Sequence, residues 1–161
     1  MPVPRDPSPT RRRILIRSGE LAAGAALVSL VAPAPGRASP QAMQELVRSI
    51  IAEAELRPGK VTLDVPALVE NGNAVPLAVL VESPMSAADH VTAIHVVNEK
   101  NPQPDVVSFR LGPRAGRASV ATRIRLADTQ TVVAIAELSD GSFWSARASV
   151  VVTLAACLED A

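Results

Sequence analysis

Short runs of apolar, mostly β-branched residues alternate with turn-forming residues from Lys60 to the end of the sequence. Such runs, bounded by Gly, Pro, Asn and Asp, are typical of β-strands. About seven strands are predicted, at residues 61–65, 75–82, 91–98, 106–111, 118–127, 131–138 and 143–154. This number and spacing predict an all-β fold, an immunoglobulin-like antiparallel β-sandwich. Asn71-Gly72 and Ser139-Asp140-Gly141 are expected to form turns that use positive φ.

A different periodicity precedes the strands, between residues 41 and 56. Apolar side chains recur there three and four positions apart: Met43, Leu46, Val47, Ile50 and Ile51. This spacing predicts an amphipathic N-terminal helix. The sequence Arg57-Pro58-Gly59 is expected to end it.

The predicted strand at residues 118–127 has two unlike faces. Val120, Ile124 and Leu126 share one face, whereas Arg123 and Arg125 share the other. The basic face is interpreted either as a solvated strand surface or as a surface that meets a partner or steers an anion.

The first 38 residues have the composition of an export signal. Three arginines, Arg11 to Arg13, stand ahead of a short apolar stretch, residues 21–31, that is diluted by alanine and glycine. This order predicts a twin-arginine signal peptide over residues 1–38, cleaved near Ala38, and one mature domain over residues 39–161. The predicted location is the periplasm. The apolar stretch is too short for stable membrane insertion.

Loss of the signal peptide makes the mature chain acidic, because residues 39–161 contain ten basic and fourteen acidic side chains. The chain has three Phe and Trp residues in total and no Tyr. Nucleic-acid binding requires a basic stripe or patch, so this class of partner is excluded.

Cys157 is the only cysteine in the sequence. It follows the last predicted strand, and a single cysteine cannot form an internal disulfide. Three roles remain open: pairing with another protein, covalent attachment of a ligand, or no role at all. The thiolate is the reactive form, and the neighbouring Glu159 and Asp160 disfavour it.

No other residues form a candidate site. His90 and His95 are the only histidines, and with a lone cysteine elsewhere they do not make a metal site. Nucleophile-elbow, phosphate-loop and dinucleotide motifs are absent from the sequence. We therefore expect neither catalytic residues nor a cofactor or metal.

Several segments, taken in order, resemble the SoxY family of sulfur-compound carrier proteins. They are Glu70 to Pro76, Ser83-Pro84-Met85, Asn101 to Pro104, Phe109 to Pro113, Thr122 to Gln130, Ser139 to Phe143, and Val152-Thr153 followed by a tail cysteine. The resemblance covers nearly all of the mature chain.

The resemblance implies an immunoglobulin-like carrier subunit that is not itself an enzyme. Its partner would be a second sandwich subunit, SoxZ, in a heterodimer. Cys157 would carry intermediates of thiosulfate and sulfur oxidation between other periplasmic proteins. These are a haem-containing conjugating protein, a hydrolase that releases sulfate, and a sulfur dehydrogenase.

The tail departs from the family pattern. Members typically have Gly-Gly-Cys-Gly-Gly, whereas this chain has Ala155-Ala156-Cys157-Leu158-Glu159-Asp160-Ala161. Alanine and leucine restrict the backbone and add bulk. The sequence therefore leaves three interpretations: a covalent carrier with altered substrate or partner choice, a non-covalent assembly or binding subunit without a carrier arm, and a thiol relay that forms mixed disulfides.

Overall fold

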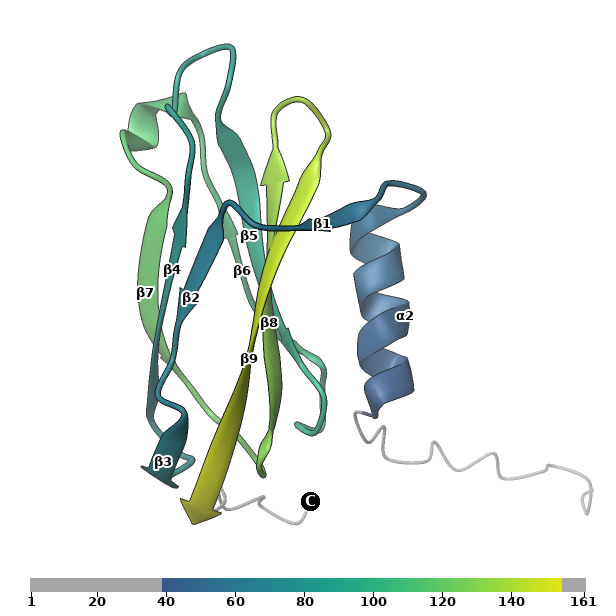
Figure 1. Cartoon of the computed structure of the whole chain (residues 1–161), viewed down its shortest axis with the longest axis vertical. Coiled ribbons are helices and arrows are strands. Elements are labelled where there is room, and N and C mark those ends of the chain that lie inside the picture. Colours follow the sequence, from purple (N-terminus) through teal and green to yellow (C-terminus); the bar gives the residue numbers. More distant parts are fainter. Residues whose placement is uncertain (1–38, 155–161) are drawn as a thin grey trace, which may run out of the picture. The chain divides into compact units, whose positions relative to one another are not determined.

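Two β-sheets face each other across a core of aliphatic side chains, with a helix on the outer face of the larger sheet (Figure 1). The structure, a computed structural model, describes residues 39–154, which fall within one compact unit. The predicted signal peptide, residues 1–38, and Cys157 lie outside the described residues.

The larger sheet has the strand order β1-β9-β8-β5-β6, with β3 also pairing with β9. Its strands are β1 (Leu56–Pro58), β3 (Leu68–Asn71), β5 (Val91–Asn98), β6 (Asp105–Arg110), β8 (Gln130–Leu138) and β9 (Phe143–Leu154). The smaller sheet has the order β2-β4-β7, formed by β2 (Val61–Asp64), β4 (Val75–Val81) and β7 (Ser119–Ile124). A short 3-10 helix, η1 (Pro113–Ala115), joins β6 to β7.

The burial pattern of each strand reflects its place in the layers. In β4, Val75, Leu77, Val79 and Val81 are buried and alternate with more exposed residues, because one face of the small sheet meets the core. Strand β8 is buried almost continuously. Its second face is covered by the helix α2 (Pro40–Ile51), so both faces of this strand are apolar.

The start of α2 follows from its sequence. The Ser39 hydroxyl accepts a hydrogen bond from the Ala42 N–H at 3.1 Å, and Pro40 occupies the first turn, where its missing N–H is not needed. The apolar side chains predicted from the periodicity pack against Val97, Val133, Ile135 and Phe143 of the sheet. No helix within residues 39–154 has the length and hydropathy to cross a membrane.

The predicted end of the helix at residue 56 is wrong, because α2 ends at Ile51. Ala52 has a positive φ of 51°, which leaves the helical region. Leu56 begins β1 and pairs with Phe143 in parallel. The backbone hydrogen bonds gained by this pairing outweigh the helix propensity of Ala52 to Leu56.

All seven predicted strands are present, and the structure adds two short ones. Strands β1 and β3 each pair in parallel with β9, near its beginning and its end respectively. Both have only three or four residues. Their pairing depends on contacts distant in sequence, so no local pattern predicts them.

The hairpin between β8 and β9 confirms the predicted turn. Gly141 has φ 78°, and Asp140 Oδ1 accepts a hydrogen bond from the Ser142 N–H at 2.9 Å. The hydrogen bond from the Ser142 hydroxyl, with that N–H, lowers the pKa of Asp140. The other turn differs from the prediction, since neither Asn71 nor Gly72 has a positive φ. Instead, Asn71 Oδ1 accepts a hydrogen bond from the Asn73 N–H at 2.9 Å.

Trp144 lies beside the connection between β1 and β2. The Lys60 ammonium is 4.7 Å from the centroid of the indole ring, and the Arg57 guanidinium is 5.8 Å from it. Gly59 has φ 109°, and a Cβ atom at this position would lie 3.7 Å from the ring. The ring distance is an ordinary van der Waals contact, so the positive φ is what explains glycine at residue 59.

Candidate functional site at the end of strand β9

Strand β9 positions the segment that leads to Cys157. Its last five residues, Val150 to Leu154, are β-branched except for the last, which favours an extended conformation. The N–H of Gly72 donates a hydrogen bond to the carbonyl of Leu154 at 2.9 Å. The N–H of Val152 donates to Thr129 Oγ1 at 3.0 Å. The root of the tail is therefore fixed, and Cys157 follows three residues later.

A network of polar side chains holds the neighbouring loops at this end of the sandwich. Asn101 Nδ2 donates a hydrogen bond to the carbonyl of Arg125 at 2.8 Å. Asn101 Oδ1 accepts hydrogen bonds from the Ala127 N–H and from Gln130 Nε2, both at 3.0 Å. Gln130 Oε1 in turn accepts from the Lys100 N–H. The buried Gln130 is thereby fully tied into the structure.

Sequence reasoning missed this network. Residues 101–104 form a loop outside the helices and strands, but the side-chain bonds of Asn101 reach 24 to 29 residues along the chain. An asparagine at the head of a proline-rich turn was the available signal. The network gives the loop after β7 a defined backbone next to the tail root.

At the same end of the sandwich, some charged side chains form ion pairs and others, among the described residues, do not. Lys100 and Asp128 form an ion pair with 3.0 Å between Nζ and Oδ2. The hydrogen bond from Lys100 is the largest cause that lowers the pKa of Asp128. Arg123 and Arg125 are exposed, and within residues 39–154 neither forms an ion pair. The burial of Ile124 and Leu126 confirms the predicted two-faced pattern.

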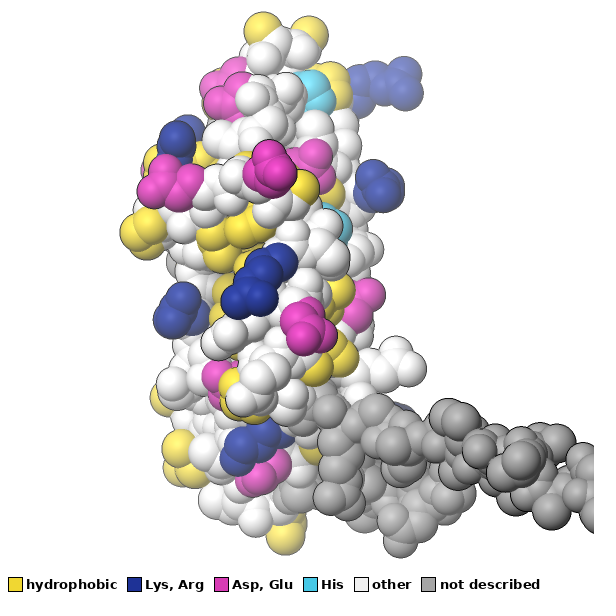
Figure 2. Space-filling view, turned by 90° about the vertical axis from the view of Figure 1, so that its right-hand side faces the viewer, with side chains coloured by type: hydrophobic (Ala, Val, Ile, Leu, Met, Phe, Trp, Pro, Cys, Tyr) yellow, Lys and Arg dark blue, Asp and Glu magenta, His cyan; other side chains and the backbone are white. Residues whose placement is uncertain are grey.

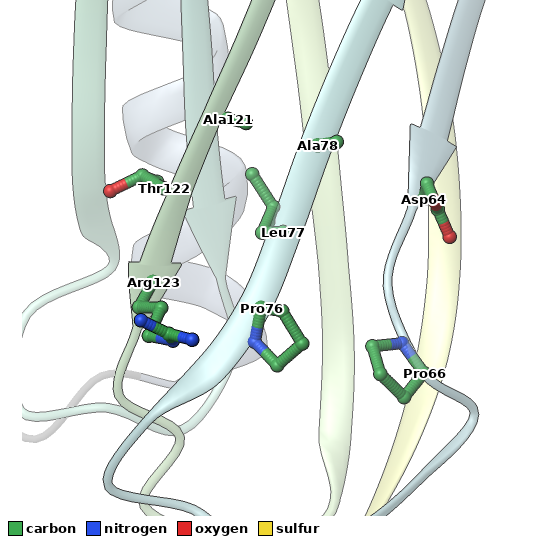
Figure 3. Close-up of a pocket in the computed structure, with 8 residues that line it drawn as sticks. All are labelled: Asp64, Pro66, Pro76, Leu77, Ala78, Ala121, Thr122 and Arg123. Carbon is green, nitrogen blue, oxygen red and sulfur yellow. The ribbon is translucent and has the colours of Figure 1, made fainter.

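A shallow hollow of about 750 Å³ lies on the outer face of the small sheet. Figure 3 shows Arg123 at the end of β7 beside Pro76 of β4, with Asp64 and Pro66 across the hollow. The remaining lining residues are Leu77, Ala78, Ala121 and Thr122. The hollow is open and lined mainly by small side chains, so it offers no enclosed site for catalysis.

The opposite side of the domain carries α2 and a mixed surface. Figure 2 shows basic, acidic and hydrophobic side chains interspersed on it. A groove of about 550 Å³ lies between α2 and the large sheet, where Arg48 and Arg147 accompany Met43, Val47 and Val133. Glu99 also lines this groove, so charges of both signs meet there.

The two histidines lie apart from the tail root. His95 is on β5, and its Nδ1 is 2.8 Å from Ser108 Oγ. Burial lowers the pKa of His95, and the carboxylates of Glu137 and Asp105 oppose this shift. His90 precedes β5 and is half-buried. Among residues 39–154, no group of His, Cys, Asp and Glu side chains is arranged to hold a metal ion.

Exposed apolar side chains border the tail root. Leu68, Val151 and Leu154 are 62%, 47% and 69% exposed. Leu68 and Val151 are partners in the parallel pairing of β3 with β9, so their side chains lie on the same face. The described end of β9 thus carries a small apolar surface, and Arg125, which forms no ion pair within residues 39–154, lies nearby.

Comparison with known proteins agrees with this architecture. A model of the family described as "Sulfur oxidation protein SoxY" matches residues 47–157. Among solved structures, the sulfur carrier protein SoxY from Chlorobium limicola f thiosulfatophilum is similar, with 25% identity and a TM-score of 0.60. The similarity covers 72% of this chain and 100% of that one. No curated protein sequence matched.

Superoxide reductases resemble this chain in fold alone. The enzyme from Ignicoccus hospitalis has 18% identity and a TM-score of 0.52, covering 71% of this chain and 94% of its own. A putative superoxide reductase from Thermotoga maritima has 19% identity and a TM-score of 0.50, covering 61% and 87%. These similarities describe the sandwich and not its chemistry.

Proposed function

Because the chain belongs to the SoxY family, we propose that it carries sulfur intermediates covalently on Cys157 during thiosulfate and sulfur oxidation. The observation that carries the proposal is the extent of the family match, which runs through the sandwich and includes residue 157. The similar structure from Chlorobium is named as a sulfur carrier protein. The chain acts as a carrier subunit, and other proteins perform the chemistry.

The fold supports a carrier arm in one specific way. Within residues 39–154, hydrogen bonds of Val152 and Leu154 hold the end of β9, and Cys157 follows three residues later in the sequence. Three extended residues span at most about 10 Å. The thiol can therefore meet a partner's active site while the domain stays folded.

The chemistry at Cys157 follows from the thiolate as nucleophile. Thiosulfate joins the cysteine sulfur through a new S–S bond, the thiol proton is released, and two electrons pass to the haem of a conjugating protein. Water then cleaves the terminal S–S bond of this adduct, sulfate leaves, and a persulfide stays on Cys157. A sulfur dehydrogenase oxidises the outer sulfur further.

The proposal places the protein in the periplasm, exported by the twin-arginine route. Residues 1–38 supply the paired arginines and the apolar stretch of the signal. In the periplasm the sandwich pairs with a SoxZ-like subunit. The transient partners are the haem-containing conjugating protein, the sulfate-releasing hydrolase and the sulfur dehydrogenase.

Intact mass spectrometry tests the carrier function. The mature protein and its SoxZ-like partner are incubated with thiosulfate and the conjugating haem protein, and masses are recorded before and after a reductant. We expect an added thiosulfate-derived mass that the reductant removes and that Cys157→Ser abolishes. An unmodified thiol in a complex that still assembles would instead identify a non-covalent binding subunit.

A further inference from the structure

Two arginines stand at the end of β7 without a carboxylate partner in the described part of the chain. Arg123 and Arg125 are both exposed and point away from the core, because Ile124 and Leu126 occupy the buried positions beside them. The ion pairs formed within residues 39–154 are Arg57 with Glu55 and Lys100 with Asp128. The positive charge at the end of β7 is therefore not offset by a direct contact there.

Arg125 lies close to the root of the tail, and Arg123 stands two residues before it at the end of β7. The carbonyl of Leu154 accepts a hydrogen bond from the Gly72 N–H at 2.9 Å, and the Gly72 carbonyl accepts one from the Leu126 N–H at 2.8 Å. Gly72 thus links Leu154, the last residue of β9, to Leu126, the residue that follows Arg125. Asn101 holds the Arg125 carbonyl, so the backbone beside the guanidinium is fixed.

The segment that continues from Leu154 carries the opposite charge. Residues 155–161 contain Glu159 and Asp160 and neither lysine nor arginine. Glu159 lies five positions after Leu154, a span of up to about 17 Å at about 3.3–3.6 Å per residue. Two hydrogen bonds through Gly72, of 2.9 and 2.8 Å, link Leu154 to Leu126, so a segment of this length can reach the neighbouring Arg125.

Other charges at this end of the sandwich do not cancel the opposite charges of the arginines and the acidic segment. Asp128 is already paired with Lys100. Glu70 is exposed on β3, next to Asn71, the partner of Leu154 in the strand pairing. Asp64 lines the same hollow as Arg123 without an ion pair to it. Glu70 and Asp64 are negative and repel the acidic segment. Among the described charges at this end that form no ion pair, Arg123 and Arg125 attract it.

We propose that Arg123 and Arg125 bind the acidic Glu159–Asp160 segment of this same chain. Cys157 lies between the fixed Leu154 and Glu159 along the sequence, so this pairing brings the thiol near two guanidinium groups. Their positive charge offsets the neighbouring carboxylates and favours the thiolate. The inference rests on the proposed function only where it gives Cys157 a role as a sulfur carrier. The charge pairing itself needs no sulfur substrate.

Alkylation of Cys157 by iodoacetamide, followed by mass spectrometry across pH, tests the proposal in the purified chain. The alkylation rate reports the thiolate fraction and hence the thiol pKa. We expect R123Q/R125Q to raise this pKa and to slow alkylation below the pKa about two- to five-fold, the range of an exposed ion pair. The same arginine change in an E159Q/D160Q background should have a much smaller effect.

The matched control is R114Q/R117Q, which removes the same charge from the η1 connection and should leave the alkylation rate unchanged. Thermal unfolding of every variant confirms that the sandwich is intact. Two results would overturn the proposal: an arginine effect of equal size in both backgrounds, or no effect in either. A failure of thiosulfate conjugation would not affect it, because iodoacetamide reacts without the conjugating protein.

Discussion

The hydroxyl of Thr129 accepts a hydrogen bond from the backbone N–H of Val152 at 3.0 Å, so the loop before β8 secures the last residues of β9. Thr153 reinforces this end of the strand, because its hydroxyl lies 3.3 Å from the carbonyl of Glu70 in β3. The root of the tail is thus held by side chains from both neighbouring segments as well as by strand pairing.

Replacement of Thr129 by valine should loosen the end of β9 without unfolding the sandwich. The change keeps the shape of the side chain and removes the acceptor, a loss of about 1 kcal/mol. Amide hydrogen exchange at Val152 should become about five-fold faster, because exchange there follows local opening. Thr92→Val, which removes a hydroxyl bonded to the Glu137 carbonyl, serves as the control. Unchanged exchange at Val152 would show that this bond does not hold the strand.

Replacement of Asn101 by alanine should destabilise the whole domain. The change leaves the Ala127 N–H, the Arg125 carbonyl and Gln130 Nε2 without the partner they now have. Unsatisfied buried polar groups cost about 1–3 kcal/mol each, and partial hydration of this half-exposed loop limits the total to about 2–3 kcal/mol. Urea unfolding measures the loss. Gln103→Ala, an exposed change in the same loop, should stay within about 0.5 kcal/mol, and equal effects would contradict the role of the network.

Replacement of Gly59 by alanine should strain the connection beside Trp144. The backbone φ of 109° is unfavourable for any residue with a Cβ atom, at a cost of about 1–3 kcal/mol. Gly112→Ala is the matched control, because nothing lies within 4 Å of the added Cβ and its φ is −152°. Thermal unfolding should show a clear decrease for Gly59→Ala alone. Equal melting temperatures of the two variants would refute this explanation.

The stability of the domain should decrease as the pH falls past the ordinary His pKa of 6.5. Because burial lowers the pKa of His95 in the folded state, the unfolded state binds the proton more tightly. The loss of stability begins near pH 6.5 and ends once the folded histidine is protonated. NMR titration of the imidazole measures the shift. Glu137→Gln should lower the pKa of His95 further, since this carboxylate opposes the effect of burial, and a rise would contradict the assignment.

The sequence was sufficient to predict the sandwich, because the patterns that indicate its strands and turns are local. The β-branched runs of β4, β8 and β9 and the turn at Gly141 each carry their own pattern. The end of α2 was predicted wrongly because Ala52 to Leu56 favour a helix locally, whereas parallel pairing with Phe143 decides their conformation. The same long-range pairing produces β1 and β3.

From the sequence, the candidate site could be predicted only as separate parts. A single cysteine after the last strand identified the candidate thiol, and the alternation around Ile124 identified the face of Arg123 and Arg125. The proximity of Arg125 to the tail root follows from Gly72, whose backbone bonds to both Leu154 and Leu126. Such contacts join segments about 50 to 80 residues apart, so composition and periodicity do not reveal them.

The two short parallel strands also bear on how the protein avoids self-association. Strand β9 has twelve residues and would otherwise present a long edge of unpaired backbone groups, a template for aggregation through strand addition. Strand β1 covers residues 143–145 and β3 covers the stretch from Val151 to Leu154. Within residues 39–154, only the middle of this edge has no neighbouring strand. Pro58 lacks an N–H, so β1 cannot pair through this residue with a further strand. The two short strands thereby discourage the domain from polymerising with its own copies through β9.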